Sequence, residues 1–162
     1  MSIKLRNMTA IYLLYGEKIL FLYRIGSRVA NNLYVGTAGG HFEHEELNDP
    51  MSCVLRELYE ETGLVKDDIE NLELRYITCR LKNNEVRQNY YFFADLLSME
   101  KKLSSAEGNL EWVDLKKAVL LPMPCSAKHV VEHFVSIGRN TDCLYAGVTT
   151  DNGIDFKELH EF

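Results

Sequence analysis

The sequence predicts an α+β fold with one β-sheet region and two or three helices. Strand-like segments rich in aliphatic and aromatic residues occur in both halves of the chain, and a well-capped helical segment separates them. The length of 162 residues suits one domain with a proper core. We therefore expect residues 1–162 to form a single domain.

The first elements are two short strands, expected at residues 9–14 and 18–24. The connection Tyr15-Gly16-Glu17 is tight and contains a glycine, which is typical of a hairpin. Residues 25–32 are small and polar and predict a loop, and a further strand is expected at residues 33–38.

A helix is predicted over residues 50–62, with both ends marked. Asp49 is a natural N-cap, Pro50 fits the first helical position, and Gly63 is well placed to end the helix. One face of this helix should pack on the core, and its members recur at helical spacing: Met51, Val54, Leu55, Leu58 and Thr62.

The second half begins with two long strands, expected at 72–80 and 86–97, with a turn at 82–85. Alternation along the aromatic run 90–93 predicts that half of it is core. A short strand is expected at 110–113, followed by a helix that Asp114 caps and that reaches Val119. A last helix is expected from Ser126 to Ser136, with Ser126 as its cap, and the tail 138–162 could form a small hairpin.

Composition excludes several classes of function. The net charge of −6 argues against binding of a nucleic-acid polymer, which would need a basic face. No stretch approaches the ~20 apolar residues that cross a bilayer, and the first residues do not resemble a signal peptide. We expect a cytoplasmic protein without a membrane partner. The four cysteines are widely spaced and are expected to be reduced.

Three glutamates on the predicted helix, Glu57, Glu60 and Glu61, stand at positions i, i+3 and i+4. They therefore share one face, where like charges repel by a few tenths of a kcal/mol per pair, roughly. A bound divalent cation would offset this repulsion, because hard metals take oxygen ligands. A lone cluster of this kind is more often a solvated acidic face, so its surroundings decide the interpretation.

Those surroundings resemble the Nudix box, G-x5-E-x7-R-E-U-x-E-E-x-G-U, where U is aliphatic. The box covers residues 39–64, and the matching residues are Gly40, Glu46, Arg56, Glu57, Leu58, Glu60, Glu61, Gly63 and Leu64. The resemblance implies an α/β/α sandwich, in which the box forms a loop–helix–loop on a mixed sheet that lies between helices.

The chain departs from that pattern at one point. Nine residues, 47–55, separate Glu46 from Arg56, where the pattern has seven. The extra residues are expected in the turn before the helix, where changes of length are tolerated. The supporting role of Glu46 could then pass to Glu45 or Glu43.

The resemblance also implies site roles. Glu57 and Glu61 would be the principal ligands of Mg²⁺ or Mn²⁺, with Glu60 nearby, and the carbonyl of Gly40 would be a further ligand. Arg56 would orient Glu57 through a charge-assisted hydrogen bond. A later loop would add Glu107, with Glu111 as second choice, although a plain polar turn is about as plausible there. Either Glu57 or Glu107 would accept the proton of the attacking water.

The substrate is expected to be a nucleotide. Size, the N-terminal hairpin and the segment Glu111–Leu115 are similar to MutT-type members, which cleave nucleoside triphosphates such as 8-oxo-dGTP to monophosphate and pyrophosphate. Arg24 could contact a phosphate, Gly39 and Gly40 would lie against the substrate, and Ser126 could meet the base. Cleavage of ADP-ribose or a nucleotide sugar, a non-catalytic nucleotide-binding module, and a homodimer remain open alternatives.

Overall fold

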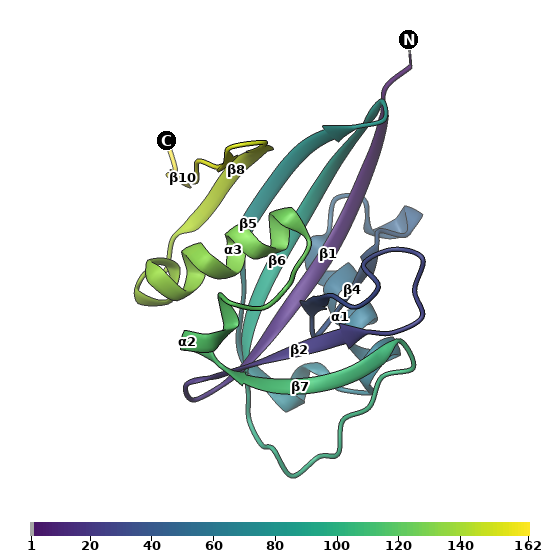
Figure 1. The fold of residues 1–162 in the computed structure, drawn as a ribbon, viewed down its shortest axis with the longest axis vertical. Coiled ribbons are helices and arrows are strands. Elements are labelled where there is room, and N and C mark those ends of the chain that lie inside the picture. The colour runs from purple at the N-terminus through teal and green to yellow at the C-terminus, as the bar shows by residue number, and fades with distance from the viewer. Residues whose placement is uncertain (1) are drawn as a thin grey trace.

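The computed structural model describes residues 2–162 and places a mixed β-sheet between two helical layers (Figure 1). Helix α1 (Pro50–Thr62) covers one face, and α2 (Leu115–Ala118) and α3 (Cys125–Ser136) cover the other. The predicted α+β sandwich is confirmed. The strands are β1 (Lys4–Tyr15), β2 (Lys18–Arg24), β3 (Tyr34–Gly36), β4 (Ala38–His41), β5 (Ile69–Lys82), β6 (Glu85–Leu96), β7 (Gly108–Asp114), β8 (Leu144–Thr150), β9 (Gly153–Ile154) and β10 (Lys157–Leu159).

The sheet runs in the order β10-β8-β5-β6-β1-β2-β3, with β4 paired to β1, β7 to β2 and β9 to β8. Strand β1 is the central element, because it pairs in parallel with β6 and antiparallel with both β2 and β4. Its two antiparallel partners occupy different lengths of the strand: β4 lies along residues 8–11 and β2 along residues 13–15. The sheet therefore divides beside β1, and the functional glycines lie on the β4 branch.

Both faces of the sheet are buried, so alternating residues of one strand enter two different cores. In β6, Phe92 packs toward α1, whereas Tyr91 and Phe93 pack toward α3. All three are at most 5% exposed. The prediction that only half of the run 90–93 is core was wrong, because the helices on both sides remove the solvent face that alternation implies.

The strand predicted at 33–38 is two strands, β3 and β4, separated at Thr37. The Thr37 side chain is fully buried and bridges the division of the sheet. Its hydroxyl donates to the carbonyl of Leu20 in β2 at 2.7 Å and accepts from the amide of Leu13 in β1 at 3.1 Å. The hydroxyl thus supplies partners to backbone groups where the ladder is interrupted.

Two hairpins were predicted and are present. Strands β1 and β2 join through Gly16, whose φ of 57° suits glycine. Strands β5 and β6 join through Asn83 and Asn84, both in the left-handed region with φ of 53° and 58°, as a two-residue turn requires. Strand β1 begins at Lys4, earlier than predicted, because backbone pairing with β6 continues into residues without an apolar pattern.

Helix α1 spans the predicted residues, and its caps are those expected. The Asp49 carboxylate accepts from the amide of Ser52 at 3.0 Å, and Gly63 ends the helix with a φ of 75°. Val54 and Leu58 are fully buried and Leu55 packs beside them. Met51, placed on this face by its spacing, is instead 37% exposed, since it lies in the first turn beyond the edge of the core.

The C-terminal helices begin differently from the prediction. Asp114 occupies the N-cap position of α2, but its side chain makes no capping hydrogen bond and lies 3.7 Å from Lys117. Helix α3 begins at Cys125 after Pro124, so Ser126 is inside the helix and does not cap it. Beyond α3, β8 joins the edge of the sheet beside β5 and turns back through β9.

Within residues 2–162 no helix is long and apolar enough to cross a membrane. The four cysteines are free; Cys53 is buried and Cys125 exposed.

Candidate functional site

Strand β4 brings two glycines against the carboxylates of α1. The amide of Gly39 donates to Oε2 of Glu61 at 3.0 Å. At Gly40 a Cβ would lie 2.3 Å from Oε1 of Glu57. Only a residue without a side chain therefore lets the Glu57 carboxylate lie directly against this strand. The structure thus places Gly39 and Gly40, both predicted site residues, directly against the carboxylates of α1.

Arg56 ties the loop before α1 to the helix. Its Nε donates to Oε1 of Glu46 at 2.6 Å and Nη2 donates to Oε2 at 3.0 Å, which makes a bidentate pair. Nη1 donates to Glu57 at 2.9 Å and to Glu60 at 3.0 Å. Despite the two extra residues, it is Glu46 that makes these bonds; Glu43 lies 3.9 Å away in an ion pair.

The Glu46 carboxylate is 7% exposed and fully bonded. Besides Arg56, its Oε2 accepts the amide of Glu43 at 2.9 Å. The hydrogen bonds from Arg56 hold the pKa of Glu46 at about 2, and this outweighs the effect of burial. Glu46 is therefore a permanent anion that fixes the Arg56 guanidinium, which in turn fixes the Glu57 carboxylate.

The pKa values of Glu61 and Glu57 are shifted in the opposite direction to that of Glu46. Burial raises the pKa of Glu61 to about 7, and repulsion from Glu107 and Glu57 adds to it against the hydrogen bond from Gly39. Burial also raises the pKa of Glu57, although Arg56 opposes the shift. Two desolvated carboxylates side by side are costly without a cation to share.

These oxygens suit a divalent metal by their chemistry. The Glu57 and Glu61 carboxylates, together with the adjoining carbonyl of Gly40, would form a hard, all-oxygen donor set, the kind Mg²⁺ and Mn²⁺ prefer. Within residues 2–162, no three acidic, histidine or cysteine side chains already converge as a metal cluster. Glu60 does not converge with Glu57 and Glu61, because it is half-exposed and turned toward Arg56.

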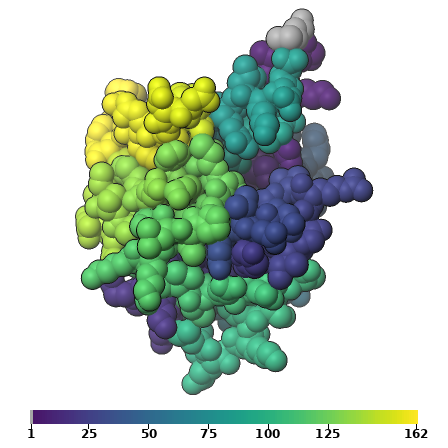
Figure 2. Space-filling model, in the orientation of Figure 1, coloured from purple at the N-terminus to yellow at the C-terminus, as the bar shows by residue number. Residues whose placement is uncertain are grey.

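A cavity of about 260 Å³ opens beside these carboxylates. It lies between the sheet, the loop 25–33 and the start of α3; in Figure 2 that loop (dark blue) lies directly against the green segment that leads into α3. The amide of Tyr34 binds the carbonyl of Pro122 at 2.9 Å and holds the two segments together. Glu61 and Gly39 lie at one end of the cavity lining.

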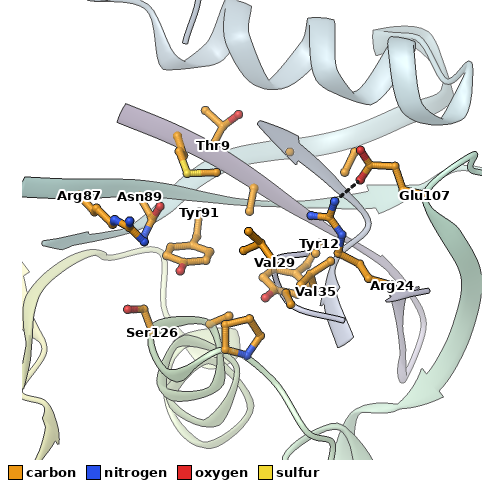
Figure 3. A pocket seen from close by; sticks show the side chains of 18 of the residues that line it. Thr9, Tyr12, Arg24, Val29, Val35, Arg87, Asn89, Tyr91, Glu107 and Ser126 are labelled. Atoms are coloured by element: carbon orange, nitrogen blue, oxygen red, sulfur yellow. Dashed lines mark ion pairs between the residues drawn. The ribbon is translucent and has the colours of Figure 1, made fainter. Parts of the chain in front are cut away.

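Arg24 and Glu107 also lie at this end. Nη2 of Arg24 is 3.2 Å from Oε2 of Glu107, drawn as the dashed line in Figure 3. Arg24 Nε is buried and has no partner within residues 2–162, so the guanidinium keeps donor capacity for a ligand. The second-choice carboxylate, Glu111, is not in the lining and accepts instead from the hydroxyl of Tyr34 at 3.0 Å.

Ser126 lines the cavity from α3, but its hydroxyl already bonds to that of Thr149 at 3.0 Å. The sequence reasoning missed the opposite wall, where Arg87, Asn89 and Tyr91 of β6 face the cavity (Figure 3). The signal was present as alternation, since every second residue from 87 to 91 points to one face of a strand. Its position opposite the box depends on the pairing of β6 with β1, which is not a local property.

Comparison with known proteins agrees with this geometry. The family model of the NUDIX domain matches residues 4–134. A MutT protein from Bacillus halodurans superposes with a TM-score of 0.66 at 22% identity, over 94% of this chain and 97% of that one. The NUDIX domain of NrtR from Shewanella oneidensis, complexed with ADP ribose, gives 0.62 at 16%, over 87% and 90%.

An Ap4A hydrolase from C. elegans gives a TM-score of 0.64 at 15% identity, over 86% of this chain and all of that one. No curated protein matches the chain in sequence. At these identities the three structures are alike in fold alone.

Proposed function

Because the chain belongs to the Nudix family, we propose that it is a metal-dependent pyrophosphohydrolase that acts on a nucleotide. The observation that carries the proposal is the contact of Glu57 and Glu61 with the β4 glycines beside a cavity. Two partly buried carboxylates with raised pKa values, one of them held by an arginine, are the arrangement expected of a cation site.

The residues would act as follows. Glu57, Glu61 and the carbonyl of Gly40 would hold Mg²⁺ or Mn²⁺, and Glu60 and Glu107 could join them. When bound, the metal neutralises charge on the pyrophosphate oxygens and makes the attacking water more acidic. Arg24, at the same end of the cavity, contacts a phosphate through its unpaired Nε.

The reaction is hydrolysis of one P–O–P bond. The water oxygen bonds to phosphorus, the bridging oxygen leaves with the other phosphate, and the water proton passes to a carboxylate. Glu57 and Glu107 are the two candidates for that base. Glu57 is 12% exposed and held by Arg56, whereas Glu107 is 43% exposed and paired with Arg24. Glu107→Gln separates them: if Glu107 is the base, kcat at saturating metal falls and the acidic limb of the pH–rate profile is lost, whereas loss of a metal ligand raises the metal concentration needed for activity.

For the substrate, we propose first a nucleoside triphosphate, with 8-oxo-dGTP as a candidate, cleaved to monophosphate and pyrophosphate. The similarity in fold to a MutT protein supports placing a nucleoside triphosphate first among the candidate substrates. ADP-ribose or another nucleoside diphosphate-linked compound is the alternative, and the ADP ribose complex of a similar fold supports testing it. The products distinguish them, since only the first reaction releases pyrophosphate.

The test is a panel of dGTP, 8-oxo-dGTP, ADP-ribose and a nucleotide sugar, with Mg²⁺, Mn²⁺ or a chelator, and chromatographic separation of the products. Glu61→Gln runs beside the wild type, because it removes a ligand charge with little change of shape. We expect metal-dependent cleavage that the variant reduces by at least 100-fold. Binding of nucleotide without cleavage under every condition would instead make the protein a non-catalytic binding module.

A further inference from the structure

Three arginines stand side by side on the sheet at the end of the cavity away from Glu61. Arg6 of β1 is the register partner of Arg87 in β6, and Arg87 is also the register partner of Arg80 in β5. All three line the cavity. Like charges directly opposite on neighbouring strands destabilise a sheet, so this row needs an explanation.

The row is only partly neutralised. Oε1 of Glu85 is 3.6 Å from Nη1 of Arg6 and 2.7 Å from Nε of Arg87, so one carboxylate serves two guanidinium groups. Arg6 also donates to Nε2 of His41 at 2.5 Å. Three positive charges therefore face one negative charge.

Arg80 makes no ion pair or side-chain hydrogen bond within residues 2–162, and its Nε is buried. The hydroxyl of Tyr12, a fully buried residue in the same cavity lining, also has no partner there. A buried donor without an acceptor costs about 1–3 kcal/mol. Unpaired donors along one cavity indicate that its ligand, rather than the protein, supplies the acceptors.

The row is far from the catalytic carboxylates. Ala10 is the register partner of Gly39, whose amide binds Glu61, and Arg6 lies four residues before Ala10 on the same strand. At 3.3 Å per residue the separation along β1 is roughly 13 Å. One pyrophosphate, whose phosphorus atoms share a single oxygen, cannot reach both ends. Figure 3 shows the same arrangement, with Arg87 and Asn89 on the opposite side of the cavity from Glu107.

We propose that Arg80 and Arg87, with Arg6 beside them, bind a second anionic group of the substrate, a phosphate ester on the nucleoside remote from the scissile pyrophosphate. The inference rests on the proposed nucleotide hydrolysis and narrows its substrate class. Tyr91, between the two ends, then faces the nucleoside itself, and Asn89 lies beside Arg87.

A neutral base is the competing occupant, because arginine also donates to the oxygen and nitrogen acceptors of guanine. Charge favours the ester: a neutral ring would leave two surplus positive charges uncompensated, whereas a phosphate dianion balances them. Arginine forks also match phosphate geometry with two parallel hydrogen bonds.

The experiment compares substrates that share a pyrophosphate and differ by one phosphate on the ribose. Two such pairs are NADP⁺ with NAD⁺, and coenzyme A with dephospho-coenzyme A. With Mg²⁺ at fixed ionic strength, we expect kcat/KM at least tenfold higher for the phosphorylated member of one or both pairs. Equal values in both pairs, or a preference that follows guanine among simple nucleotides, would overturn the proposal and leave the hydrolase function intact.

Variants test whether the arginines cause the preference. Arg80→Gln with Arg87→Gln should abolish it, and Arg80→Lys with Arg87→Lys should restore part of it, since charge returns without the fork. Arg139→Gln is the matched control, because it removes an arginine paired with Glu17 outside this cavity and should leave the preference unchanged. A preference that survives the double Gln variant contradicts the assignment.

Binding gives a readout that does not need catalysis. Calorimetry should show adenosine 3′,5′-bisphosphate or its 2′,5′ isomer binding at least tenfold more tightly than AMP to the wild type, and equally to the double Gln variant. If no compound is cleaved, the hydrolase proposal fails. The calorimetric comparison of the bisphosphates with AMP then decides by itself whether the arginines bind a second phosphate. Equal binding of both bisphosphates and AMP would show that they do not.

Discussion

Arg56 and Glu46 form a bidentate pair across the two-residue expansion of the box. The nine residues between them run from Leu47 through the Asp49 cap into the first turns of α1, and the helix and its carboxylates keep their spacing. Since the Glu46 carboxylate is buried and also binds the amide of Glu43, the loop is fastened at one point.

Glu46→Gln should destabilise the fold by about 2 kcal/mol, because it replaces charge-assisted hydrogen bonds by weaker ones. Urea unfolding at pH 7 measures the change. Glu45→Gln, at the adjacent exposed position, is the control and should stay within about 0.5 kcal/mol of the wild type. Equal losses in both variants would show that the pair with Arg56 contributes nothing specific.

The stability difference between wild type and Glu46→Gln should depend on pH. The folded pKa of Glu46 is about 2, below the ordinary glutamate value of 4.5, so its contribution is complete above pH ~4.5 and is lost as pH falls toward 2. Urea midpoints of both proteins at pH 7, 4 and 3 should therefore converge on acidification. A difference that stays constant over this range would contradict the depressed pKa.

Gly40→Ala should impair the site more than the fold. The new Cβ would displace the Glu57 carboxylate, a movable side-chain end, so the cost in stability is small. Displacement of a catalytic group by about 1 Å lowers turnover by on the order of 100-fold. Parallel measurement of kcat and of the urea midpoint separates the two effects. Normal turnover with an unchanged midpoint would mean that Glu57 need not lie against β4.

In the metal-free protein, the contribution of Glu61 to stability should depend on pH in the opposite direction. Its folded pKa of about 7 lies above the ordinary glutamate value of 4.5, so the folded state holds a proton that the unfolded state releases. Stability with chelator present should fall as pH rises from about 4.5 through 7. Between pH 5 and pH 8, the Tm of the wild type should therefore fall relative to the Tm of Glu61→Gln. A parallel pH dependence in the two proteins would refute it.

Local patterns predicted the elements whose ends are chemically marked. Asp49, Pro50 and Gly63 define α1, and the hairpin turns follow from residues that accept their backbone angles. The division of the predicted third strand at Thr37 was not predictable in this way. It depends on which neighbour each half pairs with, and that is settled by contacts far apart in the sequence.

The same limit applies to the site. Glu57, Glu60 and Glu61 could be grouped by their spacing on one helix, and the other box residues could be named from the resemblance to the Nudix box. Arg80 and Arg87 belong to no sequence motif, and they come together with Arg6 only through the pairing of β5, β6 and β1. Ser126 illustrates the converse, since its place at the start of a helix suggested a cap and the structure gives its hydroxyl to Thr149.

The two-residue turn at Asn83 and Asn84 has an evolutionary consequence. Arg80 precedes the turn by three positions and Arg87 follows it by three, so the two arginines oppose each other only while the turn keeps its length. A register slip of one residue would rotate one of them to the α1 face of the sheet. If binding of a ligand by this row is under selection, the length of the turn is preserved as strongly as the arginines themselves, although the turn touches no ligand.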